Sequence, residues 1–164
     1  MDRPMDTRTL IKASLSSVRN ELAETFSHLT DGMLGWAPSE GMRTVQGQFV
    51  EILSTERSIV NRVQGLPRID FKEIEAPFWA ATTVGELVQR LEEVRATTLQ
   101  ALDNLDDQAF NAAVAVSEDF ANWLELPSVP ASEMFRFLAR HESYHAGQLV
   151  AYLWARGDNP YNWE

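Results

Sequence analysis

Residues 131–157, ASEMFRFLARHESYHAGQLVAYLWARG, decide the fold of this chain of 164 residues. The stretch has no proline and no glycine before Gly147, so it predicts one long helix. Gly157 suits the left-handed conformation that commonly follows a helix end. Apolar or nearly apolar positions recur at alternating steps of four and three, as in a helix that faces the core of a bundle. These positions are Met134, Leu138, His141, His145, Gln148 and Tyr152.

His141 and His145 lie one turn apart on this predicted inner stripe, so both rings can converge on one point. They are either hydrogen-bonded core histidines or two ligands of one metal ion, since neutral imidazole is the commonest metal ligand. The letters HESYH also match the H-E-x-x-H motif of zinc peptidases, in which Glu142 would be the general base. That motif is short, no later histidine exists as a third ligand, and the chain is small for a protease. A metallopeptidase is therefore the third hypothesis for function.

Composition excludes several classes of protein. Hydrophobic residues make up 45% of the chain, which is ample for one core, so we expect a single domain over residues 1–164. Because cysteine is absent, the chain has no disulfide, thiolate nucleophile or cysteine-ligated metal. A net charge of −10 opposes nucleic-acid binding. The chain has no long apolar run and begins without the apolar segment of a signal peptide, so we expect a cytoplasmic protein without membrane contact.

Three further helices are predicted from periodicity and capping residues. The first covers residues 7 to about 29 with Asp6 as N-cap, the second 43 or 44 to about 64, and the third begins after Thr83 and ends before 106. Residues 66–82 are expected to be a long connection. In residues 107–130 a short extended segment near 113–116 and a helical turn are expected, and Ser132 is a possible cap of the last helix. The fold class is all-α, a four-helix bundle with long connections. The apolar stripe of the first helix is Leu10, Leu15, Val18, Leu22 and Phe26.

The second helix supplies two carboxylates. Glu56 falls on its apolar stripe, whereas Glu51 lies beside Ile52, about 100° round the helix. An inward carboxylate is costly unless it is paired or bound to metal, so both are candidate partners of the histidines. The alternatives are a solvent-exposed Glu51 and a Glu56 that forms a buried ion pair with an arginine. The remaining histidine, His28, is expected to be a surface or capping residue near the end of the first helix.

At these residues the chain resembles the DinB/YfiT-like superfamily of metal-dependent four-helix bundles. The resemblance rests mainly on HESYHAGQL at residues 141–149, which is similar to the H-x-x-x-H and following G-Q of the family's last helix. Residues 45–57, the connector Trp36-Ala37-Pro38 and residues 156–160 fit the family pattern as well. Members with an intact site usually carry a histidine five residues before a glutamate on the second helix. Aligning Glu56 with that glutamate places Glu51 at the ligand position.

The resemblance implies a centre of Glu51, His141 and His145 for a divalent metal ion: Zn, Ni, Mn or Fe. A carboxylate can replace an imidazole in such a site, although the replacement is equally compatible with a lost metal. Glu56 would orient a ligand or act as a base. Tyr144 and Gln148 would surround the site and contact the cofactor or the ligands.

The family further implies an enzyme that uses a low-molecular-weight thiol, as the mycothiol- and bacillithiol-dependent transferases and isomerases do. The metal would activate a thiol or, in a hydrolase, water, for reaction with a small-molecule substrate. The rival interpretation is a metal-free dimeric bundle that acts as a stress-response or interaction module. A homodimer is expected in either case, through exposed aromatic residues such as Trp154 or Trp163.

Overall fold

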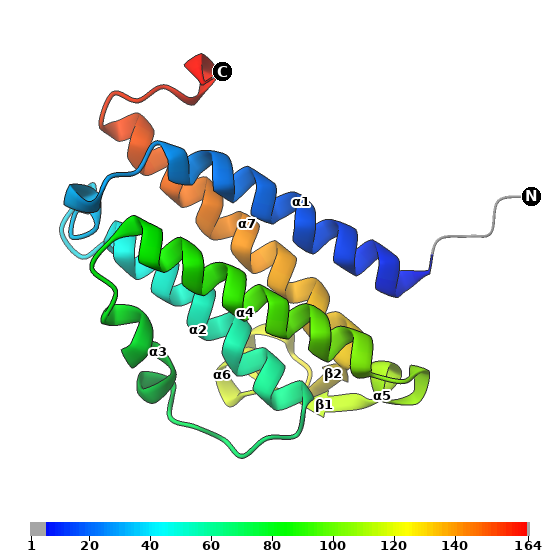
Figure 1. Cartoon of the computed structure of the whole chain (residues 1–164). Coiled ribbons are helices and arrows are strands. Elements are labelled where there is room, and N and C mark those ends of the chain that lie inside the picture. Colours follow the sequence, from blue (N-terminus) through cyan, green and yellow to red (C-terminus); the bar gives the residue numbers. More distant parts are fainter. Residues whose placement is uncertain (1–5, 164) are drawn as a thin grey trace, which may run out of the picture.

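Four long helices form the bundle in this computed structural model, which describes residues 6–163 apart from the side chains of residues 119, 123 and 124. They are α1 (Thr7–Ser27), α2 (Val45–Val63), α4 (Val84–Asn104) and α7 (Ala131–Ala155). Helix α7 packs against α1 and α2, and α4 closes the ring by packing against the same two helices (Figure 1). The predicted all-α four-helix bundle is confirmed. Residues 1–5, where the expectation about a signal peptide applies, lie outside the described residues.

The helices are arranged as two parallel pairs. Helices α1 and α7 run in one direction, and α2 and α4 run in the other (Figure 1). Parallel neighbours need a long crossover, and this crossover contains α3 (Phe71–Trp79), which packs against α2. Residues 66–82 form the long connection expected from the sequence, but the helix within it was not predicted. The sequence signal was weak because α3 is short, contains Pro77, and buries only Ile74 and Phe78.

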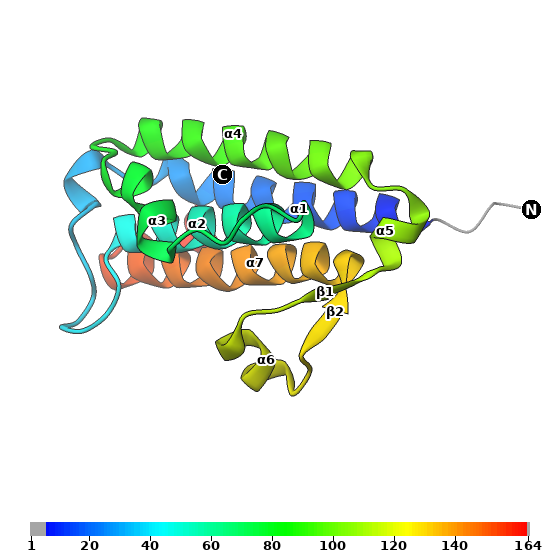
Figure 2. The same cartoon turned by 90° about the horizontal axis from the view of Figure 1, so that it is seen from below.

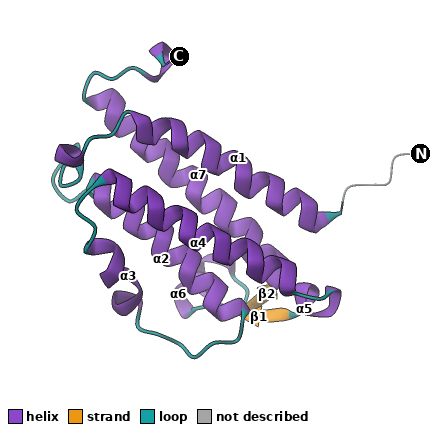
Figure 3. Ribbon diagram, in the orientation of Figure 1, coloured by secondary structure: helices purple, strands orange, loops and turns teal. Residues whose placement is uncertain are grey.

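A small hairpin interrupts the connection from α4 to α7. After α5 (Asp107–Asn111), strand β1 (Ala113–Ala115) pairs antiparallel with β2 (Ser128–Pro130), and Val114 lies opposite Val129. Helix α6 (Glu118–Leu124) lies between the strands and projects with them from the bundle on the α7 side (Figures 2 and 3). The predicted extended segment and helical turn are both confirmed. Two short 3₁₀ helices, η1 (Asp31–Met33) and η2 (Pro160–Asn162), lie in the remaining connections.

Polar side chains fix most of the helix starts. Asp6 accepts a hydrogen bond from the Thr9 amide at 2.9 Å, and Thr83, after which the third helix was expected to begin, forms a capping box with Glu86. The predicted cap at Ser132 was wrong, because α7 already begins at Ala131 and has no side-chain cap. Gly157 ends this helix with φ of 90°, as predicted.

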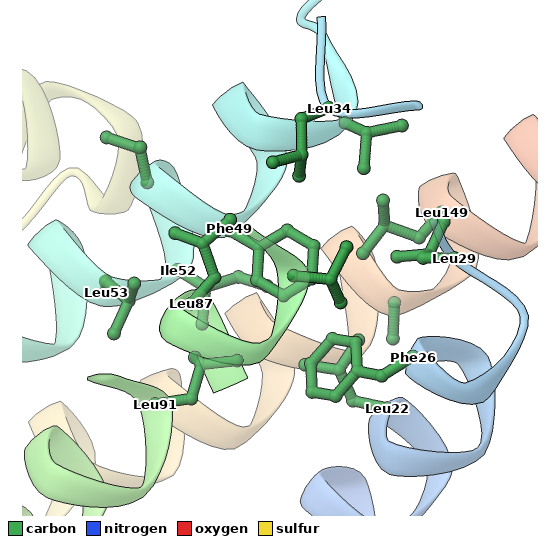
Figure 4. Packing of buried hydrophobic residues seen from close by; sticks show 14 of the residues in the cluster. Leu22, Phe26, Leu29, Leu34, Phe49, Ile52, Leu53, Leu87, Leu91 and Leu149 are labelled. Carbon is green, nitrogen blue, oxygen red and sulfur yellow. The ribbon is translucent and has the colours of Figure 1, made fainter. Parts of the chain in front are cut away.

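Apolar side chains from all four long helices meet in the core (Figure 4). The rings of Phe26 on α1 and Phe49 on α2 stack there with centroids 4.8 Å apart. Burial of each such large apolar side chain contributes about 1.5–3 kcal/mol. The stripe of α1 differs from the prediction at one place, since Leu10 is 45% exposed and Ile11 takes its place in the core. Each helix is amphipathic, and within the described residues none has the length and apolar character needed to cross a membrane.

Candidate metal centre

The interface of α2 and α7 brings Glu51, His141 and His145 together. One ligand atom from each of the three side chains lies within 4.8 Å of the others. The two Nε2 atoms of the histidines are 3.2 Å apart, and Nε2 of His141 is 3.8 Å from Oε1 of Glu51. The three residues that the family resemblance selected therefore converge on one point.

This centre lies at the edge of the bundle. His145 is 2% exposed, whereas the side chains of His141 and Glu51 keep 15% and 20% of their surface exposed. The inner face of α7 is rotated relative to the predicted stripe, because Glu142 and Leu149 are buried where His141 and Gln148 were expected. The rotation leaves one side of the centre open to solvent, and that side is where a small molecule could reach it.

The Nδ1 atom of His145, on the far side of its ring, is held by Gln48. Nδ1 lies 2.6 Å from Oε1 of Gln48, whose Nε2 donates to the Tyr152 hydroxyl at 2.9 Å. That hydroxyl in turn donates to the main-chain carbonyl of Arg43 at 2.8 Å. No role of Gln48 was predicted from the sequence. The available signal was a glutamine one turn before Glu51 on a helix face that is otherwise apolar.

The charges around the centre favour metal-binding protonation states. Burial is the main cause that lowers the pKa of His145 to about 4, and the electrostatic interaction with His141 lowers it further. The nearby His141 ring is the main cause that lowers the pKa of Glu51, and the Arg43 guanidinium, 3.0 Å from its carboxylate, lowers it further. A neutral imidazole at His145 and an ionised carboxylate at Glu51 are therefore present near pH 7, as metal coordination requires.

Glu56 and Glu142 lie in a different place, in a buried network of ion pairs. The Glu56 carboxylate accepts hydrogen bonds from Arg95 at 2.7 and 3.2 Å and from Thr98 at 2.6 Å. The Glu142 carboxylate accepts from Arg19 at 2.6 Å and also from Arg95. Both carboxylates are at most 2% exposed. This placement supports the ion-pair alternative for Glu56.

The same network argues against a general-base role for Glu142. In the H-E-x-x-H hypothesis the glutamate would face the ion that the histidines hold. Here it points into the bundle, toward two arginines, and is not part of the group formed by Glu51 and the histidines. The match to the peptidase motif is therefore not accompanied by peptidase geometry.

Tyr144 and Gln148 flank the histidines. Tyr144 is 64% exposed, and its ring lies edge-on to that of His145 with centroids 5.3 Å apart. Gln148 is half-buried, and its Oε1 has no hydrogen-bond partner among the described residues. Both side chains therefore border the centre, and their role as contacts of a cofactor stays a prediction.

The aromatic residues expected to support a dimer differ from each other. Trp163 stacks on His28 with centroids 4.1 Å apart, and its indole N–H donates to Asp158 at 2.8 Å. Trp163 was expected to be an exposed residue, but these contacts partly bury it. Trp154 is 49% exposed, in line with the expectation for that residue. His28 also contacts Asp158 at 2.9 Å, so its expected position at the end of α1 is confirmed.

The donor set fits a divalent transition metal. Two imidazole nitrogens, each about 2.0–2.1 Å from a tetrahedral zinc ion, would lie roughly 3.3 Å apart. The observed separation of the two Nε2 atoms is 3.2 Å. Two nitrogens and one carboxylate oxygen suit Zn, Ni, Mn or Fe, and the open side leaves room for further ligands.

Comparisons with known proteins agree with this fold. A family model described as the DinB superfamily matches residues 14–149. The structure is similar to that of a mycothiol-dependent maleylpyruvate isomerase, with a TM-score of 0.61 and 16% identity, over 85% of this chain and 60% of that one. It is also similar to a DinB-like protein from Bacillus cereus, with a TM-score of 0.61 and 19% identity, over 89% of this chain and 92% of that one.

These similarities differ in what they establish. The present chain spans only 60% of the isomerase, and at 16% and 19% identity the two solved structures show a shared fold. No curated protein matches the sequence. The family model, in contrast, covers most of the chain, including all three residues of the centre. The protein belongs to the DinB superfamily.

Proposed function

We propose that this protein is a metal-dependent enzyme in which Glu51, His141 and His145 hold a divalent ion and a small molecule reacts at its open side. One observation carries the proposal: one ligand atom from each of Glu51, His141 and His145 lies within 4.8 Å of the others. A divalent ion at this point supplies Lewis-acid chemistry that lowers the pKa of a thiol or of water.

The alternative of two packed core histidines explains less of the geometry. It needs only one Nε2–H to donate to the other Nε2, and it does not require an ionised carboxylate beside them. The Nδ1 atom of His145 is hydrogen-bonded to Gln48. A hydrogen bond on the ring nitrogen that does not face the metal is usual for a metal-bound imidazole. Arg43 balances the negative charge of Glu51 without occupying the centre, since it contacts the other carboxylate oxygen, Oε2.

The three candidate ligands lie on different sides of the centre. His145, being buried, closes the inner side of the centre to water, and His141 and Glu51 border the side from which a substrate would approach. Because the chain has no cysteine, a reacting thiol would come from a second substrate. The fold shared with a mycothiol-dependent isomerase supports a thiol in this role, and a hydrolase that activates water is the main variant.

Metal content tests the proposal directly. We expect elemental analysis of untagged protein to find about one ion per chain after incubation with Zn, Ni, Mn or Fe and removal of free metal. His141→Ala and Glu51→Ala should lose most of that metal. His28→Ala and Glu24→Ala are matched controls, because they remove a histidine and an exposed carboxylate elsewhere, and they should keep it. Absence of metal in the wild-type protein under all four conditions would refute the proposal.

The thiol is tested separately. With metal bound, we expect isothermal titration to show that a low-molecular-weight thiol binds the wild-type protein and not His141→Ala. Equal thiol binding with and without metal would contradict a thiol at this centre. It would leave activation of water as the remaining chemistry for a metal-loaded protein.

A further inference from the structure

We infer that Gln48, Tyr152 and the main-chain carbonyl of Arg43 form a relay that fixes the ring tautomer and orientation of His145. The inference rests on the proposed metal centre and deepens it, because it identifies positioning residues behind one ligand. These residues touch no substrate and act only through the imidazole.

The direction of each hydrogen bond follows from the end of the relay. The carbonyl oxygen of Arg43 can only accept, so the Tyr152 hydroxyl, 2.8 Å away, must donate its single hydrogen there. The Tyr152 oxygen then accepts from the side-chain amide nitrogen of Gln48 at 2.9 Å. This assigns the amide orientation, so that Oε1 of Gln48 faces His145.

The amide orientation then decides the tautomer. Oε1 of Gln48 has no hydrogen to give, so Nδ1 of His145, 2.6 Å away, must carry the ring hydrogen. The lone pair of the neutral imidazole is consequently on Nε2, the atom that points at His141 and the candidate ion position. A main-chain carbonyl outside α2 and α7 thus determines which nitrogen of His145 is free to bind metal.

Burial makes the alternative arrangement unfavourable. Gln48 and Tyr152 are 2% and 3% exposed, so water cannot replace a lost partner. Whichever ring nitrogen of His145 carries the hydrogen, a flipped Gln48 amide would direct its oxygen at the Tyr152 hydroxyl oxygen, whose hydrogen is already donated to Arg43. Buried polar groups left unpaired in this way cost more than the hydrogen bonds themselves contribute.

The connector before α2 holds the relay in place. Trp36 lies edge-on to the Tyr152 ring with centroids 5.9 Å apart, and its carbonyl accepts from the Val45 amide at 2.9 Å. Arg43 contributes twice, because its carbonyl ends the relay while its guanidinium pairs with Glu51 at 3.0 Å. One residue of this connector therefore positions two of the three candidate ligands.

The inference is tested with Gln48→Met and Gln48→Glu, measured in two ways. Nitrogen-15 NMR of metal-free protein reports the tautomer of His145, and competition with a chelator gives the Kd for zinc. In the wild-type protein we expect the Nδ1–H tautomer. Gln48→Met should populate both tautomers and weaken zinc binding by about 10–100-fold. Gln48→Glu keeps an acceptor for Nδ1–H, and the Tyr152 hydroxyl can turn to donate to the second carboxylate oxygen, so this variant should keep the tautomer and bind zinc within a few-fold of wild type.

Gln46→Met is a matched control, because it is the same substitution two residues earlier on α2. Gln46 donates to the carbonyls of Trp79 and Ala81, away from the histidines, so its replacement should change neither the tautomer nor the Kd. If Gln48→Met does not fold, Tyr152→Phe removes the hydroxyl and keeps the ring. That variant frees the amide to flip and should likewise populate both tautomers.

Failure of the inference and failure of the metal centre give different results. A wild-type His145 in the Nε2–H form, or a folded Gln48→Met or Tyr152→Phe variant with an unchanged single tautomer, overturns the relay. Unchanged zinc affinity in Gln48→Met overturns its role in metal binding. A wild-type protein that binds no zinc refutes the metal centre, and with it the role of the relay in metal binding. Whether the relay fixes the tautomer of His145 is then still tested by NMR of the metal-free protein.

Discussion

Arg95 on α4 and Glu56 on α2 form a buried bidentate ion pair, with nitrogen–oxygen distances of 2.7 and 3.2 Å. The same guanidinium reaches Glu142 on α7, which also binds Arg19 on α1 at 2.6 Å. Each long helix thus contributes one charge to a network of two arginines and two carboxylates. Because each of these buried charges needs a partner, we expect the network to limit how α2 and α7 rotate against each other. That rotation is what places Glu51 opposite the histidines.

Removing one member of this network should be costly. We expect Arg95→Met to lower the free energy of unfolding by about 3–5 kcal/mol, because two carboxylates stay buried without their main partner. Urea unfolding followed by circular dichroism measures this. Arg90→Met is the matched control on the same helix, where the pair with Glu93 is solvent-exposed and should contribute little to stability. Equal losses in the two variants would contradict a structural role for the buried network.

Glu142→Gln separates the ion-pair role from the peptidase hypothesis. We expect this variant to keep its metal and to lose stability, on the order of 3 kcal/mol, because Arg19 and Arg95 lose their charged partner. Metal content and urea unfolding are the two measurements. A variant that keeps wild-type stability and loses a hydrolytic activity would instead support Glu142 as a general base.

Local signals in the sequence were enough for the helices and for part of the centre. Asp6 and Thr83 marked helix starts because a cap is a local interaction between residues three apart. His141 and His145 were identified because their spacing is fixed by the helix itself. Glu51 was placed with them only through the family resemblance, since no local rule relates α2 to α7.

The contacts between helices could not be predicted in the same way. The periodicity of α7 placed His141 on the inner stripe, yet in the structure its neighbour Glu142 is buried and His141 lies at the edge. Adjacent residues point in directions about 100° apart around the helix axis. An error in the predicted direction of the buried face can therefore assign burial to the wrong one of two neighbours. The roles of Gln48 and Arg95 were missed for a related reason. Their partners lie 97 and 39 residues away in the chain, and only packing brings them together.

Glu51→His should produce a centre of three imidazoles. We expect the variant to retain zinc and to prefer zinc over manganese more strongly than the wild-type protein does, because carboxylate oxygen suits manganese better than imidazole does. Competition of the two metals, followed by elemental analysis, measures the preference. Glu51→Leu, which offers no donor atom, should bind neither metal tightly. An unchanged preference in Glu51→His would indicate that residue 51 is not a ligand.

Acid should destabilise the metal-free protein through His145. Its pKa is lowered to about 4 in the folded protein, while in the unfolded chain an imidazole has a pKa of about 6.5. Between these values the unfolded chain binds more protons, so the free energy of unfolding falls as the pH falls from about 6.5 toward 4.

The comparison with His145→Gln isolates this effect, because the other titrating groups are common to both proteins. In the presence of a chelator, urea unfolding at pH 7 and 5.5 should show that the wild-type protein loses about 1 kcal/mol more than the variant. The two proteins should show similar pH dependence above pH 7, where His145 is neutral in both states. A wild-type protein that loses no more stability than the variant would mean that His145 takes up its proton in the folded state as readily as in the unfolded chain. That result would contradict burial as the cause that disfavours the charged form of His145.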